Sequence, residues 1–360
     1  MGQTIDMDNP EDLAAIDRSG MLEALEGFPG QVREALDIGG SDVTLPSPDG
    51  LKAVVVLGMG GSGISGDVAS AVAADRGLPL PVTTVKGYQL PPLVDERTLV
   101  FAVSYSGNTE ETLDCFNQAR DRGARLVTVS SGGRLAELAG EHGIPCFKIP
   151  GGLQPRASLG HLFIPVVSAM ERMGLLSGVT GELRAAAGML DERSREYRVG
   201  VPLDANPTKR LAKDLLGYVP VVYGSEGNVA VAAMRWKAQF NENAKIPSFH
   251  NSFPELNHNE TVGWLNLADI CSHCQLVVLR EPDEHPRVEK RIRITLDLLQ
   301  DSVGHITQVC ARGGNTIERL LDLIYFGDYT SVYLALALGQ DPTPVTRIEE
   351  LKKRLAAGSQ

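Results

Sequence analysis

The chain has 360 residues, which is long enough for two domains of ordinary size. Its 34 lysines and arginines against 45 aspartates and glutamates give a net charge of −11, which disfavours nucleic acid as the main partner. No apolar run is long enough to span a membrane, and the first residues lack the pattern of a secretory signal. We therefore expect a cytoplasmic protein that binds neither nucleic acid nor membranes.

The five cysteines are scattered along the chain, which favours reduced thiols over a disulfide framework. Cys271 and Cys274 have the CxxC spacing, but no second pair follows at the spacing of a zinc site. The second cysteine also leads directly into an apolar strand. We expect packed thiols here, and neither a metal nor a cofactor.

Residues 1–45 carry apolar side chains at helical spacing and are predicted to form an N-terminal helical segment. Residues 46–198 then alternate short apolar strands with helices. The strands are expected at 52–57, 81–85, 98–104, 125–130 and 145–149, and the helices at 64–74, 109–122, 134–142 and 158–173. Continuous β-branched runs in such a rhythm predict a parallel sheet that is covered by helices on both faces.

The same rhythm restarts after a linker near residues 195–205, so residues 199–340 are predicted to form a second domain of the same kind. Its strands are expected at 218–224, 275–279 and 305–309, and its helices at 228–240, 287–299 and 317–338. Residues 341–360 then hold a C-terminal helix. The predicted fold class is α/β, with two flavodoxin-like, doubly wound and mostly parallel sheets.

A glycine-rich turn, Gly58–Gly63, follows the first strand of the first domain and leads into a helix. Its G-x-G-x-x-G pattern is also that of dinucleotide-binding folds, which place an acidic residue at the end of the second strand to hold the ribose. That strand ends at Lys86 instead. Since the turn contains Gly61 and Ser62, we favour a phosphate site of another kind.

Three further hydroxyls, Ser104, Ser106 and Thr109, lie where the third strand passes into a helix. Free N–H groups and the positive end of the helix dipole are found at such a position. Hydroxyls and amides together form a neutral cradle for a phosphate group. The alternative is a simple helix cap, which would account for one hydroxyl rather than three within six residues.

Three residues further along the chain are candidates for proton chemistry. Glu242 stands between two asparagines at the end of a helix, and His258 stands between two asparagines in a polar loop. A carboxylate and an imidazole can move protons while amides hold hydroxyls, which suits a polyhydroxylated substrate. Arg156 follows the last strand of the first domain and could face a developing negative charge. Taken singly, Glu242 and His258 are more typical of an exposed helix end and an exposed loop, and Arg156 is equally typical of an exposed loop.

Together these stretches resemble a known family. The run Ser-Tyr-Ser-Gly-Asn-Thr-Glu-Glu-Thr at 104–112 resembles the signature of sugar isomerase (SIS) domains. Combined with the stretches at 58–63, 154–158, 241–245 and 254–259, it makes nearly the whole chain similar to the bifunctional phosphoglucose/phosphomannose isomerases.

The resemblance implies two SIS domains, a homodimer, and an active site that lies between the domains and near the subunit interface. It implies that the turn with Gly61 and Ser62, together with Ser104, Ser106 and Thr109, binds the phosphate of a hexose 6-phosphate. It also implies three catalytic roles. Glu242 is the base that moves a proton between C1 and C2, Arg156 stabilises the enediolate, and His258 opens the sugar ring from the neighbouring subunit.

The family further uses a threonine and a lysine near the C-terminus. Thr346 and Lys353 lie one heptad apart and share a helix face, whereas Thr343 and Lys352 are rival matches, so this assignment stays open.

The expected function is a metal-independent aldose–ketose isomerase that interconverts glucose 6-phosphate and mannose 6-phosphate with fructose 6-phosphate through a cis-enediol. Glu242 would need a dry pocket to act as a base at neutral pH. The alternatives are another sugar-phosphate isomerase with SIS domains and a non-catalytic sugar-phosphate-binding protein. The presence of both Glu242 and His258 favours the enzyme.

Overall fold

The computed structural model describes residues 5–358, so the first four residues of the predicted N-terminal segment lie outside the described part. The chain begins, as expected, with three helices, α1 (Pro10–Ile16), α2 (Met21–Glu26) and α3 (Phe28–Gly39). The first of them starts where Asn9 accepts a hydrogen bond from the backbone N–H of Glu11, with a proline at the first helical position.

The first sheet contains five parallel strands in the order β2-β1-β3-β4-β5. These strands are β1 (Ala53–Leu57), β2 (Val82–Val85), β3 (Thr98–Val103), β4 (Arg125–Ser130) and β5 (Cys146–Lys148). The helices that connect and follow them are α4 (Gly60–Asp75), α5 (Glu110–Asp121), α6 (Gly133–Glu141), the short 3₁₀ helix η1 (Pro155–Ala157) and α7 (Leu159–Arg172). The strand order is that of a flavodoxin-like, doubly wound sheet, which confirms the predicted fold class for this half.

The second sheet contains four parallel strands in the order β7-β6-β8-β9, which repeats the first four positions of the first sheet. The strands are β6 (Val219–Ser225), β7 (Phe249–Phe253), β8 (Cys274–Arg280) and β9 (His305–Cys310). The helical elements of this half are α9 (Pro207–Asp214), α10 (Asn228–Gln239), η2 (Phe240–Ala244), η3 (Glu255–His258), η4 (Glu260–Leu265), α11 (Ala268–Cys271), α12 (Pro286–Leu299) and α13 (Thr316–Ala337). The restart of the βα rhythm is thus confirmed.

The sequence did not predict the strand β7, the helix α9 or the short helical elements η2, η3, η4 and α11 of the second half. Strand β7 lies at an edge of its sheet, and its residues are mostly exposed or half-buried. Its sequence therefore lacks the run of apolar residues by which a buried strand is recognised. Helix α9 begins at Asn206, whose side chain accepts from the N–H groups of Thr208 and Lys209. The Asn-Pro pair that caps this helix resembled a linker in the sequence.

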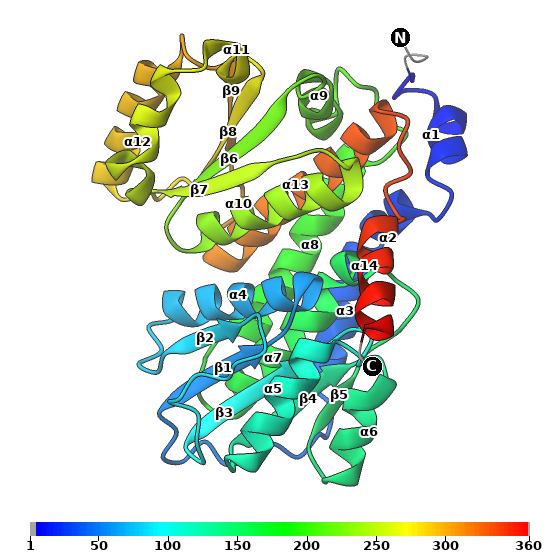
Figure 1. The fold of residues 1–360 in the computed structure, drawn as a ribbon, viewed down its shortest axis with the longest axis vertical. Coiled ribbons are helices and arrows are strands. Elements are labelled where there is room, and N and C mark those ends of the chain that lie inside the picture. The colour runs from blue at the N-terminus through cyan, green and yellow to red at the C-terminus, as the bar shows by residue number, and fades with distance from the viewer. Residues whose placement is uncertain (1–4, 359–360) are drawn as a thin grey trace.

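The two sheets lie on either side of a central layer of helices, as Figure 1 shows. Helix α4 packs on β1 and β2 of the first sheet, α10 packs on β6 and β7 of the second, and the two helices contact each other. One core cluster fills this central layer, with Val54 and Phe101 from the first sheet and Val222 and Val277 from the second. Alternate strand residues face outward into smaller clusters, one below α5 and α6 and one below α12.

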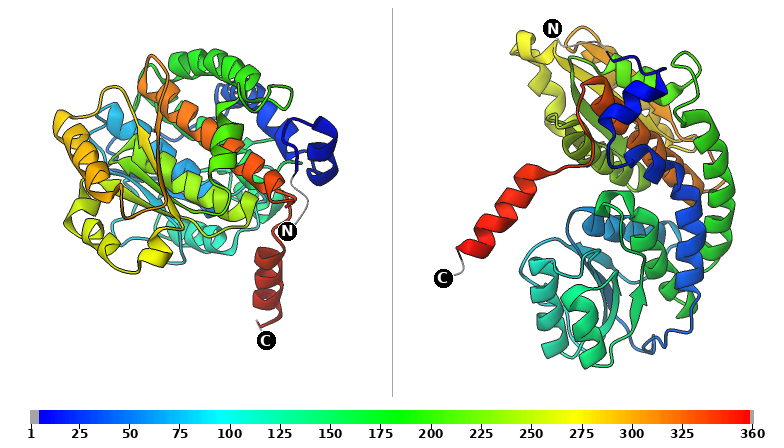
Figure 2. Two further views of the ribbon diagram at one scale, coloured as in Figure 1. Left: turned by 90° about the horizontal axis from the view of Figure 1, so that it is seen from above. Right: turned by 90° about the vertical axis from the view of Figure 1, so that its right-hand side faces the viewer.

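Helix α8 (Val179–Tyr197) runs along one side of both halves and contacts α3 and α13 (Figures 1 and 2). The predicted boundary between residues 198 and 199 falls directly after it and stays a prediction. The last helix, α14 (Thr346–Ala357), projects from the body of the molecule, as both views of Figure 2 show. No helix in residues 5–358 is long and apolar enough to cross a membrane.

Candidate active site

The carboxyl edge of the first sheet brings two turns together, one after β1 and one after β3. The turn after β1 lies close to the chain around Arg156. A side chain added at Gly61 would place its Cβ only 2.7 Å from the carbonyl oxygen of Pro155. Only glycine permits this approach. The predicted phosphate turn and the predicted catalytic arginine are therefore neighbours.

The hydroxyls of both turns converge as the sequence predicted. The hydroxyl of Ser62, in the first turn of α4, accepts a hydrogen bond of 3.2 Å from the backbone N–H of Tyr105. The Ser104 and Thr109 hydroxyls lie 2.9 Å apart, with Thr109 at the N-cap of α5. Ser106 is exposed, and its hydroxyl accepts from the N–H of Asn108. The starts of α4 and α5 thus present hydroxyls and N–H groups at one place, which is what an anion requires.

Arg156 and Glu242 come from different halves of the molecule and meet. The Arg156 guanidinium is almost fully buried, and its Nη1 lies 3.6 Å from Oε2 of Glu242. Its Nε donates to Oδ1 of Asn243 at 2.7 Å. Its Nη2 donates to the carbonyl oxygens of Pro342 and Thr343, at 2.7 and 2.8 Å. These bonds fix the plane of the guanidinium, whereas the Glu242 side chain keeps 29% of its surface accessible.

Glu242 lies on a π-helical turn, η2, which continues α10. Such turns widen the helix locally and turn side chains away from the regular spacing. The turn ends at Ala244 and is followed by Lys245, which has a positive φ of 60°. The Lys245 ammonium donates to the carbonyl oxygen of Glu242 at 2.6 Å and to that of Pro342 at 2.8 Å. It therefore ties the end of η2 to the segment that leads toward α14.

Burial and neighbouring cations weaken the charged forms of both basic groups in the site. Burial lowers the pKa of Arg156, although the Glu242 carboxylate acts in the opposite direction. Burial, with a smaller contribution from the nearby Arg156 cation, also lowers the pKa of Lys245, to about 8. An anion that enters here would meet the buried Arg156 cation and the partly exposed Lys245 cation, so its charge would be stabilised.

His258 lies apart from this group. It ends η3, beyond β7, and its side chain is exposed. No hydrogen bond or ion pair joins its ring to another residue in the described part of the chain. The residues on either side of it are held, since Asn257 donates to the Thr295 hydroxyl at 2.8 Å and Glu260 accepts from Tyr223 and Asn251. The exposed ring is thus presented on a fixed loop.

The C-terminal candidates are also placed away from Arg156. Thr346, Lys352 and Lys353 are exposed residues of the projecting helix α14. Thr343 lies closer, because its carbonyl oxygen accepts from Arg156 and its hydroxyl is buried without a hydrogen-bond partner in the described chain. The structure of a single chain therefore brings together the cradle, Arg156, Glu242 and Thr343, and leaves His258 and the α14 residues outside this group.

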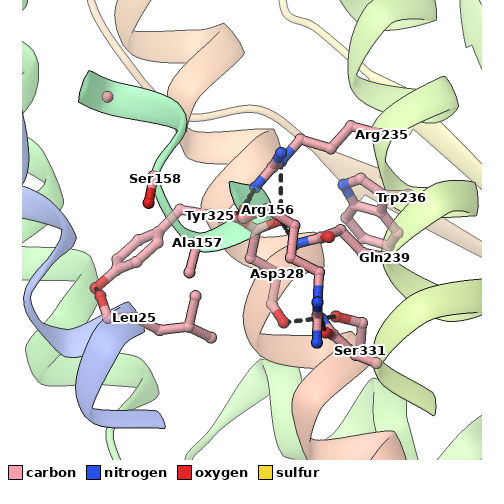
Figure 3. Close-up of polar contacts among 12 residues, drawn as sticks. Leu25, Arg156, Ala157, Ser158, Arg235, Trp236, Gln239, Tyr325, Asp328 and Ser331 are labelled. Carbon is pink, nitrogen blue, oxygen red and sulfur yellow. Dashed lines mark hydrogen bonds and ion pairs between the residues drawn. The ribbon is translucent and has the colours of Figure 1, made fainter. Parts of the chain in front are cut away.

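Sequence reasoning missed the residues that support the arginine. Asp328 lies on α13 and is 4% exposed. Its carboxylate accepts hydrogen bonds from the side chains of Arg235 and Gln239, as Figure 3 shows. A carboxylate inside an apolar helix is a signal that could have found it, because a buried charge needs a partner. The hydrogen bonds that the Pro342 and Thr343 carbonyl oxygens accept from Arg156 could not be predicted from the sequence, since every residue has a backbone carbonyl.

In residues 5–358 no three histidine, cysteine, aspartate or glutamate side chains gather in a way that could hold a metal ion. All five cysteines are free thiols, and burial raises the pKa of Cys274. At the CxxC pair, Cys271 is buried and Cys274 is half-buried.

Comparison with known proteins adds independent information. Residues 204–355 match the family model described as the bacterial phospho-glucose isomerase C-terminal SIS domain. A bifunctional phosphoglucose/phosphomannose isomerase of Caldicellulosiruptor bescii is 38% identical over 336 residues, which cover 93% of this chain and 99% of the relative. A protein of the same name from Aquifex aeolicus is 38% identical over 304 residues, which cover 84% of this chain and 90% of the relative.

Among solved structures, a hypothetical protein of Thermus thermophilus is similar with a TM-score of 0.73. The match covers 97% of this chain and 93% of that protein, at 15% sequence identity. At this identity the likeness concerns the fold, and it extends over both sheets.

Proposed function

Since this chain belongs to the bifunctional phosphoglucose/phosphomannose isomerase family, we propose that it interconverts fructose 6-phosphate with glucose 6-phosphate and mannose 6-phosphate. One observation carries the proposal. Arg156 and Glu242, 86 positions apart in the sequence, lie 3.6 Å from each other beside a cradle of hydroxyls and helix N-termini. A phosphate anchor next to a carboxylate and a cation is what an enediolate reaction requires.

The first role is to anchor the substrate. Ser62, Ser104, Ser106 and Thr109, with the N–H groups at the starts of α4 and α5, bind the phosphate in our proposal. Gly61 lets this anchor lie directly against η1. Binding at the phosphate fixes the far end of the sugar and so holds C1 and C2 near Glu242, which removes much of the entropic cost of the reaction.

The second role is proton transfer. Glu242 takes the proton from C2 of the open aldose, the electron pair of the C–H bond forms a C1–C2 double bond, and the C1 oxygen becomes negative. The proton of the C2 hydroxyl passes to the C1 oxygen, Glu242 returns its proton to C1, and the oxygen at C2 becomes the ketose carbonyl. In reverse, protonation of C2 on one face of the planar enediol gives glucose 6-phosphate, and protonation on the other face gives mannose 6-phosphate.

The third role is to stabilise the charge of the intermediate. Arg156 is buried, held in place by three acceptors, and has Nη1 directed toward Glu242. A fixed cation in a dry site is worth far more to a developing oxyanion than one in water. No step of this scheme requires a metal or an organic cofactor.

We further propose a homodimer in which His258 opens the sugar ring in the site of the neighbouring subunit. His258 is exposed and is followed by a segment with exposed apolar side chains, Val262, Leu265, Leu267 and Ile270, which are 62 to 76% exposed. Such a patch is typical of a protein–protein interface. Thr346 with Lys353, or Thr343 with Lys352, would complete the site, and Thr343 is favoured on the threonine side by its contact with Arg156.

The free thiols fit a reducing compartment, and we place the enzyme in the cytoplasm.

The test is a coupled assay that starts from fructose 6-phosphate, with and without EDTA, and measures glucose 6-phosphate and mannose 6-phosphate separately. We expect both products, at rates that EDTA does not change. Glucose 6-phosphate alone would keep the mechanism and remove the second activity. Absence of both products, with fructose 6-phosphate still raising the melting temperature, would support the non-catalytic sugar-phosphate-binding protein or an isomerase for another sugar phosphate.

The shared site has its own test in mixed dimers. Glu242→Gln and His258→Ala subunits should each be inactive alone, because each dimer lacks one function at both sites. Mixed dimers hold one intact site when the histidine comes from the partner, so mixing should restore about a quarter of the wild-type activity. If mixing restores nothing while the subunits exchange, His258 does not act across the interface.

A further inference from the structure

We propose that a closed ring of hydrogen bonds through Arg156, Arg235, Asp328, Ser331 and Asn243 sets the distance between the two catalytic groups. The proposal rests on the roles given above to Arg156 and Glu242. The other four members are positioning residues, which touch neither substrate nor reacting atoms in this scheme. They act by holding the arginine and the chain that carries the glutamate.

The need for such a device follows from the topology. Arg156 lies on η1, a three-residue turn that belongs to the first half of the molecule. Glu242 lies on η2, a five-residue turn that belongs to the second half. Neither turn has the rigidity of a long helix, and no short chain connection joins them. Their separation must therefore be set by contacts across the junction of the two halves.

The ring can be followed bond by bond, starting at the backbone of Arg156. Its carbonyl oxygen accepts from Nη2 of Arg235 on α10, at 2.8 Å. Arg235 donates through two nitrogens to both carboxylate oxygens of Asp328 on α13, at 3.0 and 2.7 Å. Gln239 adds a third donor to this carboxylate at 2.8 Å. Figure 3 shows Arg235 and Gln239 reaching Asp328 beside Arg156.

The return path leads from the backbone of Asp328 to the arginine side chain. The carbonyl oxygen of Asp328 accepts from the Ser331 hydroxyl at 2.7 Å. That hydroxyl accepts from Nδ2 of Asn243 at 2.9 Å. Oδ1 of Asn243 accepts from Nε of Arg156 at 2.7 Å, which closes the ring. The backbone and the side chain of Arg156 are thus held by opposite ends of one network.

Burial makes this network stiff. Its five members are each at most 4% exposed. In such surroundings a broken hydrogen bond leaves a polar group without water, so alternative arrangements are strongly disfavoured. The bidentate contact between Arg235 and Asp328 also fixes the relative orientation of α10 and α13.

The ring reaches Glu242 through the peptide chain. Asn243 is the next residue on the same π-helical turn, and both ends of its amide are occupied, by Arg156 and by Ser331. The position of this residue determines where the Glu242 carboxylate can lie. One amide side chain therefore sets both the arginine and the base, and a shift of the order of 1 Å in either is enough to impair the reaction.

Two variants break the return path at different places. Asn243→Ala removes the contact with Arg156, and Ser331→Ala releases the far side of the Asn243 amide. We expect each to lower kcat about tenfold to a hundredfold and to leave KM within about twofold, because the phosphate cradle is not part of the ring. The assay is the isomerisation of fructose 6-phosphate, with thermal unfolding measured in parallel.

The matched control is Thr330→Val on the same helix. Thr330 is fully buried, and its hydroxyl donates to the carbonyl oxygen of Phe326 at 2.8 Å, as Ser331 does to that of Asp328. Its hydroxyl accepts no hydrogen bond from Asn243. The control removes a buried hydroxyl from α13 without opening the ring, so its kcat should stay within about twofold of the wild type.

A double-mutant cycle separates positioning from general destabilisation. If Asn243 acts partly through Arg156, the loss of kcat caused by Asn243→Ala should be smaller in an Arg156→Lys background than in the wild type, and the remaining loss reflects its hold on Glu242. An undiminished loss in that background would overturn the proposal. The proposal would also be overturned if Thr330→Val and Ser331→Ala lowered kcat equally, or if Asn243→Ala and Ser331→Ala both kept the wild-type kcat.

The same experiment distinguishes this inference from the proposed function. Wild-type protein without turnover on any hexose 6-phosphate would overturn both. Active wild-type protein that also stays active as Glu242→Gln would refute the assignment of the base. Active wild-type protein that depends on Glu242 but not on Asn243 or Ser331 would refute the ring alone.

Discussion

The two halves of the molecule share one topology but turn opposite helix ends toward the site. In the first half the N-termini of α4 and α5 face the site, with their free N–H groups and partial positive charge. In the second half the C-terminal end of α10 reaches it and continues into the π-helical turn that carries Glu242. The same architecture therefore supplies the groups proposed to anchor the phosphate from one half and the proposed base, Glu242, from the other.

The carboxyl edges of the two sheets differ as well. The first edge presents serines and a threonine, whereas the second presents Glu226 after β6 and Glu281 and Glu284 after β8. Glu284 is bound by Arg280, and burial raises the pKa of Glu281. Carboxylates repel a phosphate group, so this edge does not repeat the first. A shared fold does not by itself make a binding site, because the site depends on the side chains placed at the edge.

The largest expected effect tests whether the second half supplies the chemistry. Glu242→Gln keeps the shape of the side chain and removes its capacity to take a proton, so kcat should fall between about 10² and 10⁴-fold. Protection by fructose 6-phosphate in a thermal shift assay should remain, because the phosphate anchor is intact. Retained turnover would show that another group is the base.

The opposite pattern is expected at the first edge. Ser104→Ala removes a hydroxyl from the cradle and should raise KM for fructose 6-phosphate about tenfold or more, with a smaller change in kcat, since hydrogen bonds to a charged group contribute about 1.5–3 kcal/mol. The control is Ser225→Ala, at the carboxyl end of β6 in the second sheet. If both variants raise KM equally, the division between the two edges is wrong.

A third prediction concerns the contact that joins the phosphate turn to Arg156. Gly61→Ala would bring a Cβ to 2.7 Å from the Pro155 carbonyl oxygen, so the backbone must shift. We expect a loss of about 1–3 kcal/mol in the free energy of unfolding together with a lower kcat. Gly188→Ala in α8, where no atom lies within 4 Å of the added Cβ, should leave kcat unchanged and slightly increase stability. Urea denaturation and the coupled assay measure both effects.

The smallest effect concerns Lys245, whose pKa is lowered by burial to about 8 from an ordinary value of 10.5. Between these two pH values the unfolded chain still holds a proton that the folded protein has lost, so the free energy of unfolding increases with pH. The wild type should therefore gain stability relative to Lys245→Met from pH 7.5 to pH 10. The gain should stay below about 1 kcal/mol because the side chain is partly in water. A difference in urea midpoints that stays constant or moves the other way would contradict this.

Much of this arrangement could be predicted from local sequence. The continuous apolar strands, such as Ala53–Leu57, identified both sheets, because a strand buried on two faces must be apolar at every position. The hydroxyl cluster from Ser104 to Thr109 was found for a similar reason, since a strand end and a helix start are visible in a few neighbouring residues. The edge strand β7 was missed because half-exposed residues carry no such pattern.

The sequence by itself indicated most of the strands and helices in their order, the turns proposed to bind phosphate, and Arg156 and Glu242 as candidates, because each depends on neighbours in the chain. The tertiary structure alone decided that these two residues meet, and that Asp328 and Asn243 hold them. It also placed Thr343 beside the arginine while the Thr346–Ala357 helix projects outward. Contacts between residues dozens of positions apart depend on how the two halves pack, and no local pattern in the chain records that packing.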